Sequence, residues 1–268
     1  MVEILGYLAA ILIGLSLGLI GGGGSILTVP VLVYLFAIEP VVATAYSLFI
    51  VGLTSSVGAF NYFKQGLVKL KTALLFGIPS IFSVFLTRNY LIPTIPEEIF
   101  SVGSFTLTKG VFLMALFAVL MILASYKMIT SKNKPKETVK KQTSQSTKEY
   151  VLIILQGLFV GMITGLVGAG GGFIIIPALV FLLGLEMKEA IGTSLTIITL
   201  NSLFGFLVSQ SHIQTDWTLL LGLSAMAIIG IFIGMRLAKN IDGAKLKPLF
   251  GWFVLLMGSY ILLKELVF

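Results

Sequence analysis

Apolar segments of about 20 residues recur along the whole chain, and they constrain its fold more than any other feature. Segments of this length cross the hydrocarbon core of a bilayer as helices, and the alternating pattern of barrel strands is not seen. Composition agrees, because 57% of the residues are hydrophobic and only 11% are charged, whereas soluble domains carry roughly 25% charged residues. The sequence therefore predicts an all-α integral membrane protein, surrounded by the lipid bilayer.

The chain repeats itself after a shift of 147 residues, which carries Gly18 onto Gly165. The stretch GLSLGLIGGGGSILTVPVLVYLFAIE, from Gly14, aligns with GMITGLVGAGGGFIIIPALVFLLGLE, from Gly161. Internal duplication is a frequent plan in transporters. We predict a first transmembrane repeat in residues 1–130, a cytoplasmic lysine-rich linker in residues 131–149 and a second repeat in residues 150–268.

Each half offers five apolar segments, and the second segment of each half is short. About 13 residues give ~20 Å of helix, which does not span a ~30 Å hydrocarbon core. We therefore expect the first two segments of each half to form a hairpin or a broken pair, with glycines near the midplane. The predicted segments are 2–20, 25–38, 41–63, 72–92 and 107–130, then 150–167, 173–185, 188–210, 217–238 and 246–267.

The basic residues predict the orientation, because cytoplasmic loops carry an excess of Lys and Arg. With the linker inside and five segments in each half, both termini lie outside and the two halves are inverted repeats. The expected location is the cytoplasmic (inner) membrane, and the net charge of +7 follows from the loop bias rather than from nucleic-acid binding. The stretches expected inside contain Lys64, Lys69, Lys71, Arg236, Lys239, Lys245 and Lys247; those expected outside contain Glu97, Glu98, His212 and Asp216.

Glycine runs separate the first two segments of both halves, as GGGG at Gly21 and GAGGG at Gly168. Glycine disfavours helix, and irregular backbone within a membrane must line a cavity or be buried in protein. A helix is expected to begin after each run, near Ser25 and Phe173, and its unpaired N–H groups and positive dipole end suit an anion. The alternative is that the glycines only permit close helix packing.

The third segments carry a polar stripe on one helix face, because its members are spaced by seven and eight residues. Ser47, Thr54 and Ser55 correspond in the second half to Ser194, Asn201 and Ser202. They either hydrogen-bond an oxyanion or join helices to one another. The predicted substrate-binding residues are Gly22, Gly23, Gly24, Ser25, Ser47, Thr54, Gly170, Gly171, Gly172, Phe173, Thr193, Ser194 and Asn201.

Other polar residues carry weaker signals. Arg88 and Arg236 lie late in the fourth segments, where they either anchor the helix ends in the interface or draw anions to opposite mouths. Glu39 and Glu186 are expected to be turn residues, with gating or proton relay as the alternative. Without cysteine and with His212 as the single histidine, thiol chemistry and a multi-histidine metal site are excluded. No ATP or dinucleotide signature occurs, so we expect neither a cofactor nor an enzyme.

On these motifs the chain resembles the TauE/SafE family of membrane transporters, often called sulfite exporters. The resemblance rests on GLIGGGGSILTVPVLV and GLVGAGGGFIIIPALVFLLG, followed by ATAYSLFIV and AIGTSLTII. It implies a transporter that moves sulfite, sulfonates, thiosulfate or related organosulfur anions across the cytoplasmic membrane. Since Tyr46 stands where the second half has Thr193, and Ser25 where it has Gly172, the two half-sites are expected to differ.

The predicted mechanism is alternating access by a secondary transporter. Two alternatives stay open at this point: an anion channel that uses the same site, and a scaffold subunit that transports nothing. Assembly into a homo-oligomer also stays open.

Overall fold

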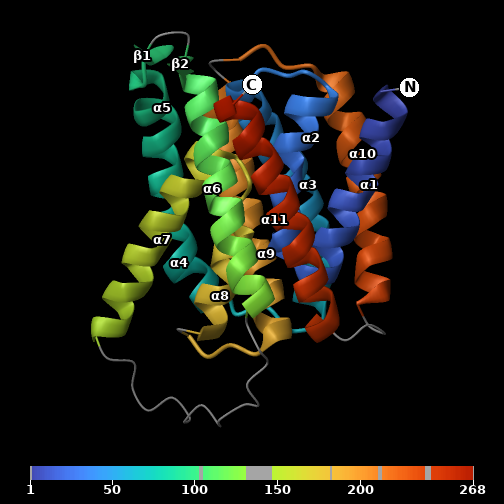
Figure 1. Ribbon diagram of the computed structural model, residues 1–268. Coiled ribbons are helices and arrows are strands. Elements are labelled where there is room, and N and C mark those ends of the chain that lie inside the picture. The colour runs from blue at the N-terminus through green and yellow to red at the C-terminus, as the bar shows by residue number, and fades with distance from the viewer. Residues whose placement is uncertain are drawn as a thin grey trace.

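The computed structural model describes residues 2–102, 105–130, 147–181, 183–210, 213–238 and 243–267, and it is dominated by helices that run along a common direction (Figure 1). The first half contains α1 (Val2–Ile20), the 3-10 helix η1 (Gly22–Leu27), α2 (Thr28–Leu35), α3 (Pro40–Lys64), α4 (Leu70–Leu86), the π-helix η2 (Thr87–Leu91), α5 (Ile92–Thr94), β1 (Glu98–Val102), β2 (Phe105–Thr108) and α6 (Lys109–Thr130). The second half contains α7 (Thr147–Val167), α8 (Gly172–Phe181), α9 (Met187–Gln210), α10 (Trp217–Leu237) and α11 (Gly243–Val267).

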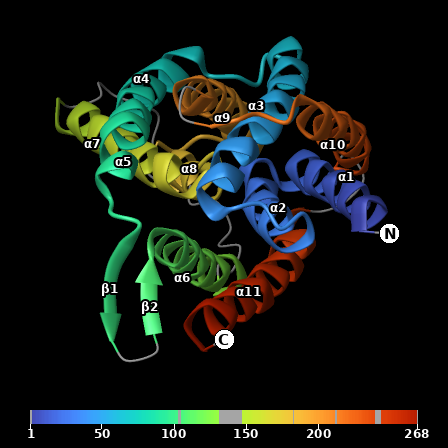
Figure 2. The same cartoon turned by 90° about the horizontal axis from the view of Figure 1, so that it is seen from above.

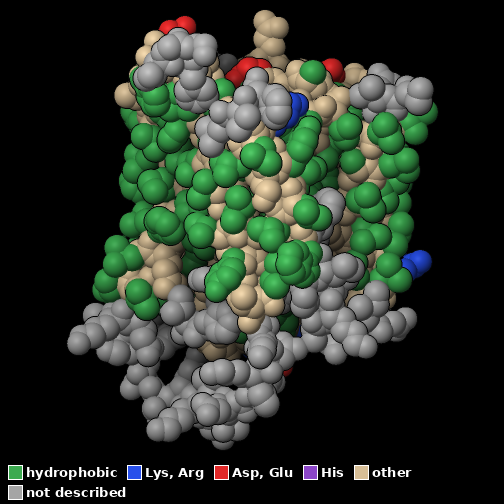
Figure 3. Space-filling model, in the orientation of Figure 1, with side chains coloured by type: hydrophobic (Ala, Val, Ile, Leu, Met, Phe, Trp, Pro, Cys, Tyr) green, Lys and Arg blue, Asp and Glu red, His purple; other side chains and the backbone are tan. Residues whose placement is uncertain are grey.

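The lateral surface is that of a multi-pass membrane protein. Within the described residues, five helical stretches are long and apolar enough to cross a membrane: α3, α9, α10, the residues Leu70–Thr94 and the residues Lys109–Tyr126. On α4, Leu74, Ile78 and Phe82 lie one helical turn apart and are all more than half exposed, as side chains that face lipid must be. Figure 3 shows hydrophobic side chains over the middle of the molecule, and charged ones near its ends.

Both predicted hairpins are formed. Helix α1 ends at a turn at Gly21, whose φ of 77° suits glycine, and α2 returns toward the end of the molecule where α1 begins (Figure 1). Helix α7 enters from the opposite end, turns at Gly168 with φ 75°, and continues into α8. With 8 residues in α2 and 10 in α8, neither returning helix spans the hydrocarbon core alone.

Helices of the two halves pack in exchanged pairs. Helix α1 packs along α10, α4 along α7, α3 along α9 and α6 along α11; seen from above, α1–α10 and α4–α7 flank α2 and α8 (Figure 2). The glycine contacts repeat with the same shift as the sequence, because Gly14 lies against the backbone of Ala227 and Gly161 against that of Ser80. Likewise, Gly58 lies against Leu195 and Ile231, and Gly205 against Leu48 and Val84. The duplication therefore extends from the sequence to the tertiary contacts.

Two local features differ from the sequence expectation. Helix α2 begins at Thr28 and not near Ser25, because the residues after Gly21 continue as the 3-10 helix η1. A 3-10 helix needs no positive φ. Of the four glycines, only Gly21 has a positive φ, and the chain turns there. The antiparallel pair β1–β2, with Phe100 opposite Leu107, was also not predicted. His212, Lys239 and linker residues 131–146 lie outside the described residues, and the division into two repeat domains stays a prediction.

Candidate functional site

The two glycine turns touch each other in the protein interior. A Cβ atom placed on Gly172 would lie 2.7 Å from the carbonyl oxygen of Gly22 and closer still to its Cα. The second turn is shaped by positive φ values of 75°, 67° and 71° at Gly168, Gly170 and Gly171, which glycine adopts without strain. We call residues 21–25 and 168–172 together the glycine crossing. It brings together the glycine residues that the sequence predicted from both halves.

Buried hydroxyl groups without partners adjoin the second turn of the glycine crossing. The Oγ of Ser202 lies 3.1 Å from the position of a Cβ on Gly170, and Oγ1 of Thr164 lies against that of Gly171. Neither hydroxyl has a hydrogen-bond partner, and buried polar groups seldom stay unpaired without a ligand or water. In the first turn, by contrast, the Ser25 hydroxyl donates to the Gly22 carbonyl oxygen at 2.7 Å. Ser55, the counterpart of Ser202 in the first half, is likewise buried with an unpartnered hydroxyl.

The predicted polar stripe is buried, but its members have different partners. Ser47, Thr54, Ser194 and Asn201 are all fully buried. Thr54 donates to a backbone carbonyl of its own helix at 2.7 Å, Ser194 does the same at 2.9 Å, and Ser47 Oγ has no partner. The side chain of Phe173 lies outside the described residues.

Two of the predicted substrate-binding residues, Asn201 and Thr193, use polar atoms to bind neighbouring elements. Asn201 Nδ2 donates to Ser80 Oγ on α4 at 2.7 Å, which leaves Asn201 Oδ1 without a partner. Thr193 Oγ1 accepts from the Lys69 backbone N–H at 3.0 Å. The Asn201 bond matches the alternative interpretation of the stripe, in which polar side chains hold neighbouring helices together.

A buried arginine marks a second feature, whose burial the sequence analysis did not predict. Arg88 lies on the π-helix η2 and is only 4% exposed, so the interpretation of this residue as an interfacial anchor is wrong. Its Nη1 donates to Thr44 Oγ1 at 3.1 Å, whereas Nε and Nη2 have no partner. Arg236 is exposed, as an anchor requires. One sequence signal was available, because the repeat shift places Arg88 opposite Met235, which is itself buried.

Arg88 lines a cavity of about 300 Å³ at the end of the molecule where α3 begins, and we call it the Arg88 cavity. Its rim includes Glu39, whose carboxylate caps α3 by accepting from two backbone N–H groups at 2.9 and 3.0 Å. The turn-residue interpretation of Glu39 is therefore confirmed. Lys109 and Glu97 also line the cavity and form an ion pair of 3.4 Å.

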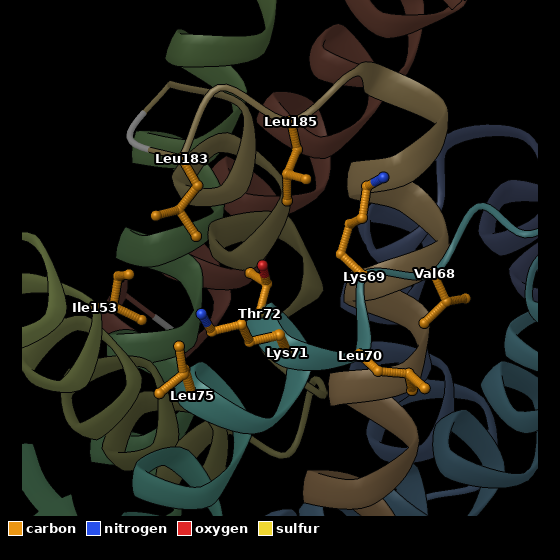
Figure 4. Close-up of a pocket in the computed structure, with 9 residues that line it drawn as sticks. All are labelled: Val68, Lys69, Leu70, Lys71, Thr72, Leu75, Ile153, Leu183 and Leu185. Carbon is orange, nitrogen blue, oxygen red and sulfur yellow. The ribbon is translucent and has the colours of Figure 1, made fainter. Parts of the chain in front are cut away.

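A cavity of about 400 Å³ lies at the other end of the molecule, where α4 and α7 begin (Figure 4). Leu75, Ile153 and Leu183 give it apolar walls, and the Lys71 side chain points toward Ile153. Lys69 forms an ion pair of 2.7 Å with Glu189. The molecule therefore has two cavities, one at each end, and each is lined by basic residues. Across the described residues, no group of three or more His, Cys, Asp or Glu side chains could hold a metal ion.

Comparison with known proteins gives a consistent result. The model of the family described as "Sulfite exporter TauE/SafE" matches residues 6–261. A "Probable membrane transporter protein" of Xylella fastidiosa (strain 9a5c) is 29% identical over 256 residues, which cover 94% of this chain and 91% of that protein. The "Probable membrane transporter protein YunE" of Bacillus subtilis is 27% identical, with 88% of each chain covered.

A third relative, the "Probable membrane transporter protein MJ0441" of Methanocaldococcus jannaschii, is 31% identical over 115 residues, which cover 41% of this chain and 43% of that protein. No solved structure matches the chain. The family match and the relatives support a membrane transporter, in agreement with the apolar lateral surface. The chain belongs to the TauE/SafE family.

Proposed function

We propose that this protein is a secondary transporter that moves sulfite or a related organosulfur anion, such as a sulfonate or thiosulfate, across the cytoplasmic membrane by alternating access. The observation that carries the proposal is the glycine crossing. There, two turns from the two halves meet backbone to backbone, next to the buried and unpartnered hydroxyls of Ser202 and Thr164.

The chemistry of the crossing suits an anion. Helix α8 begins at Gly172, and the N–H groups in the first turn of a helix have no partner within that helix. No acidic residue occurs between Glu39 and Glu97 or between Glu189 and Asp216, so α4 and the interiors of α3 and α9 bring no negative charge to the site. In this proposal the N–H groups of residues 22–23 and 170–173 bind the oxyanion, and buried hydroxyls complete its shell. The Gly24 N–H already donates to the Gly21 carbonyl oxygen at 3.4 Å, and the 3-10 helix η1 uses that of Ser25.

The arrangement of the halves supports alternating access. Helices α1 and α7 run in opposite directions, and so do α6 and α11 (Figure 1). We interpret the two halves as inverted repeats that meet at the glycine crossing near the membrane midplane, where such repeats hold their substrate. The two hairpins enter from opposite ends, so each is suited to close the path on its own side. In this proposal the end of the molecule with the α3–α4 loop faces the cytoplasm, and the basic residues of that loop support this orientation.

Counterflow in proteoliposomes tests this function. Vesicles loaded with unlabelled sulfite are diluted into labelled sulfite, and a carrier then accumulates label transiently above equilibrium. Sulfonates, thiosulfate and sulfate added outside rank the substrates by competition. Flux that only dissipates a gradient would favour the channel alternative, and absence of flux for every anion of the panel would contradict the proposal.

Two variants connect the flux to the glycine crossing. Ser202→Ala removes one unpartnered hydroxyl, and we expect exchange to fall by about tenfold, because a hydrogen bond to a charged ligand contributes about 1.5–3 kcal/mol. Gly77→Ala is the control, since a Cβ at Gly77 in α4 meets no atom within 4 Å. It should exchange like the wild type. Equal exchange in the Ser202 variant would exclude that hydroxyl from the site.

A further inference from the structure

We infer that the Arg88 cavity binds the oxyanion head of the transported anion, as a second site at the end of the protein opposite the α3–α4 loop. The inference rests on the proposed function, because it takes the ligand class from it: a small anion with at least two oxygens on one sulfur atom.

The edge of the Arg88 guanidinium that carries Nε and Nη2 is free to bind an oxyanion. Nη1 is used by Thr44 Oγ1 at 3.1 Å, while Nε and Nη2 have no partner. These two nitrogens lie on the same side of the guanidinium and direct parallel N–H bonds outward, which match two oxygens of one anion. Arg88 is only 4% exposed. Water at the surface therefore does not readily hydrate the two unpartnered nitrogens in place of an anion. A bound oxyanion relieves the cost of burying an unpaired cation.

The carboxylates around the cavity are already engaged. Glu97 forms its ion pair with Lys109, and both oxygens of Glu39 cap α3. Within the described part of the chain, no carboxylate pairs with Arg88. The positive charge of Arg88 is therefore left for a ligand.

The Arg88 cavity extends from the protein surface to buried residues. Glu39, Pro93 and Glu97 form an exposed rim, whereas Arg88 and Ser209 are buried. A volume of about 300 Å³ holds a small sulfonate together with several waters of about 30 Å³ each. Thr44 forms the link inward.

Thr44 contacts both the arginine and the second glycine turn. Its hydroxyl accepts from Arg88, and a Cβ atom on Gly168 would lie 2.6 Å from its Cα. Arg88 is thus separated from the second turn of the glycine crossing by a single residue, Thr44.

The second half has no equivalent of this site. The repeat shift places Met235 opposite Arg88 and Ile191 opposite Thr44, and both of these apolar side chains are buried. The fold therefore accommodates methionine at this position of the repeat, so packing alone does not require an arginine there. A buried arginine at one end, against exposed lysines in the cavity at the other, gives the two ends of the transporter different affinities for the anion.

Binding of methanesulfonate to the purified protein in lipid-free detergent, followed by isothermal titration calorimetry, tests the inference. Arg88→Met copies the second half, and we expect affinity to fall by about 10- to 100-fold with the loss of two charge-assisted hydrogen bonds. Arg88→Lys keeps the charge without the paired N–H groups and should lie between. Arg236→Met removes an exposed arginine at the other end and should bind like the wild type.

Thr44→Ile is a second, independent variant, which removes the hydroxyl that orients the guanidinium and should weaken binding several-fold. Size-exclusion profiles and melting curves establish that each variant is folded. Wild-type affinity in Arg88→Met, or no binding by the wild type, would overturn the inference. So would displacement of Arg88-dependent binding by short-chain phosphatidylglycerol with no effect of added sulfite, because a lipid phosphate would then be the ligand.

The two proposals fail separately. Counterflow by the wild type together with unchanged binding in Arg88→Met refutes the Arg88 site and leaves the transport function standing. Arg88-dependent binding without counterflow of any panel anion refutes the transport function and leaves the site standing.

Discussion

The contact between the two glycine turns makes a sharp prediction for Gly172→Ala. The new Cβ atom would lie 2.7 Å from the Gly22 carbonyl oxygen and nearer to its Cα, whereas optimal carbon–carbon contacts are about 3.5–4.0 Å. The turns must separate by roughly 1 Å or more. Overpacking typically costs about 1–3 kcal/mol, and we expect the upper end of that range, because the opposing atoms are backbone and have no rotamer to change.

Thermal unfolding in detergent, followed by tryptophan fluorescence, measures this effect. Gly77→Ala is the matched control, since its Cβ meets no atom within 4 Å and alanine favours helix over glycine by about 0.5–1 kcal/mol. We expect Gly172→Ala to melt several degrees below the wild type and Gly77→Ala to melt at or above it. Gly22→Ala should behave like Gly172→Ala, because its Cβ would meet the Gly172 backbone in the same contact, seen from the other side. Equal melting of Gly172→Ala and Gly77→Ala would refute the contact between the turns.

Two further predictions concern the ends of the molecule. Tyr46→Phe should lower the free energy of unfolding by about 1–2 kcal/mol, because the hydroxyl bonds the backbone before α10 at 2.7 and 3.0 Å; denaturation curves measure this, and Tyr126→Phe, with an exposed ring, should change nothing. A double-mutant cycle on Lys69 and Glu189 should give a coupling below about 1 kcal/mol, because their side chains are 46% and 21% exposed and solvent screens the pair. A larger coupling would contradict this view of the ion pair.

The helical segments and the hairpins could be predicted because they depend on local sequence. Apolar length locates the membrane helices, and glycine runs between them locate the turns. The ends of α3 and α9 were expected within one residue of where the structure has them. The start of α2 was not predicted correctly. A run of glycines is compatible both with a break in the helix and with a 3-10 helix, and the sequence does not distinguish the two.

Burial and partners could not be predicted, because they depend on residues far away in the chain. Arg88 near the end of a span has the sequence signature of an interfacial anchor, and only the packing of the α3 hydroxyl Thr44 against it shows that it faces inward. Asn201 likewise fits an anion-binding stripe by spacing, yet its amide donates to Ser80 on α4. Helical periodicity identifies a face of a helix, and it does not identify the neighbour.

The exchanged helix pairs have a consequence for biosynthesis. Gly14 in α1 lies against Ala227 in α10, so α1 leaves the ribosome about 200 residues before its partner. At synthesis rates of about 5–20 residues per second, the glycine face of α1 waits on the order of ten seconds or more. During that time lipid or the insertion machinery must cover it. A ribosome that stalls after the first half would release a fragment whose α1 and α4 both lack the helices they pack against.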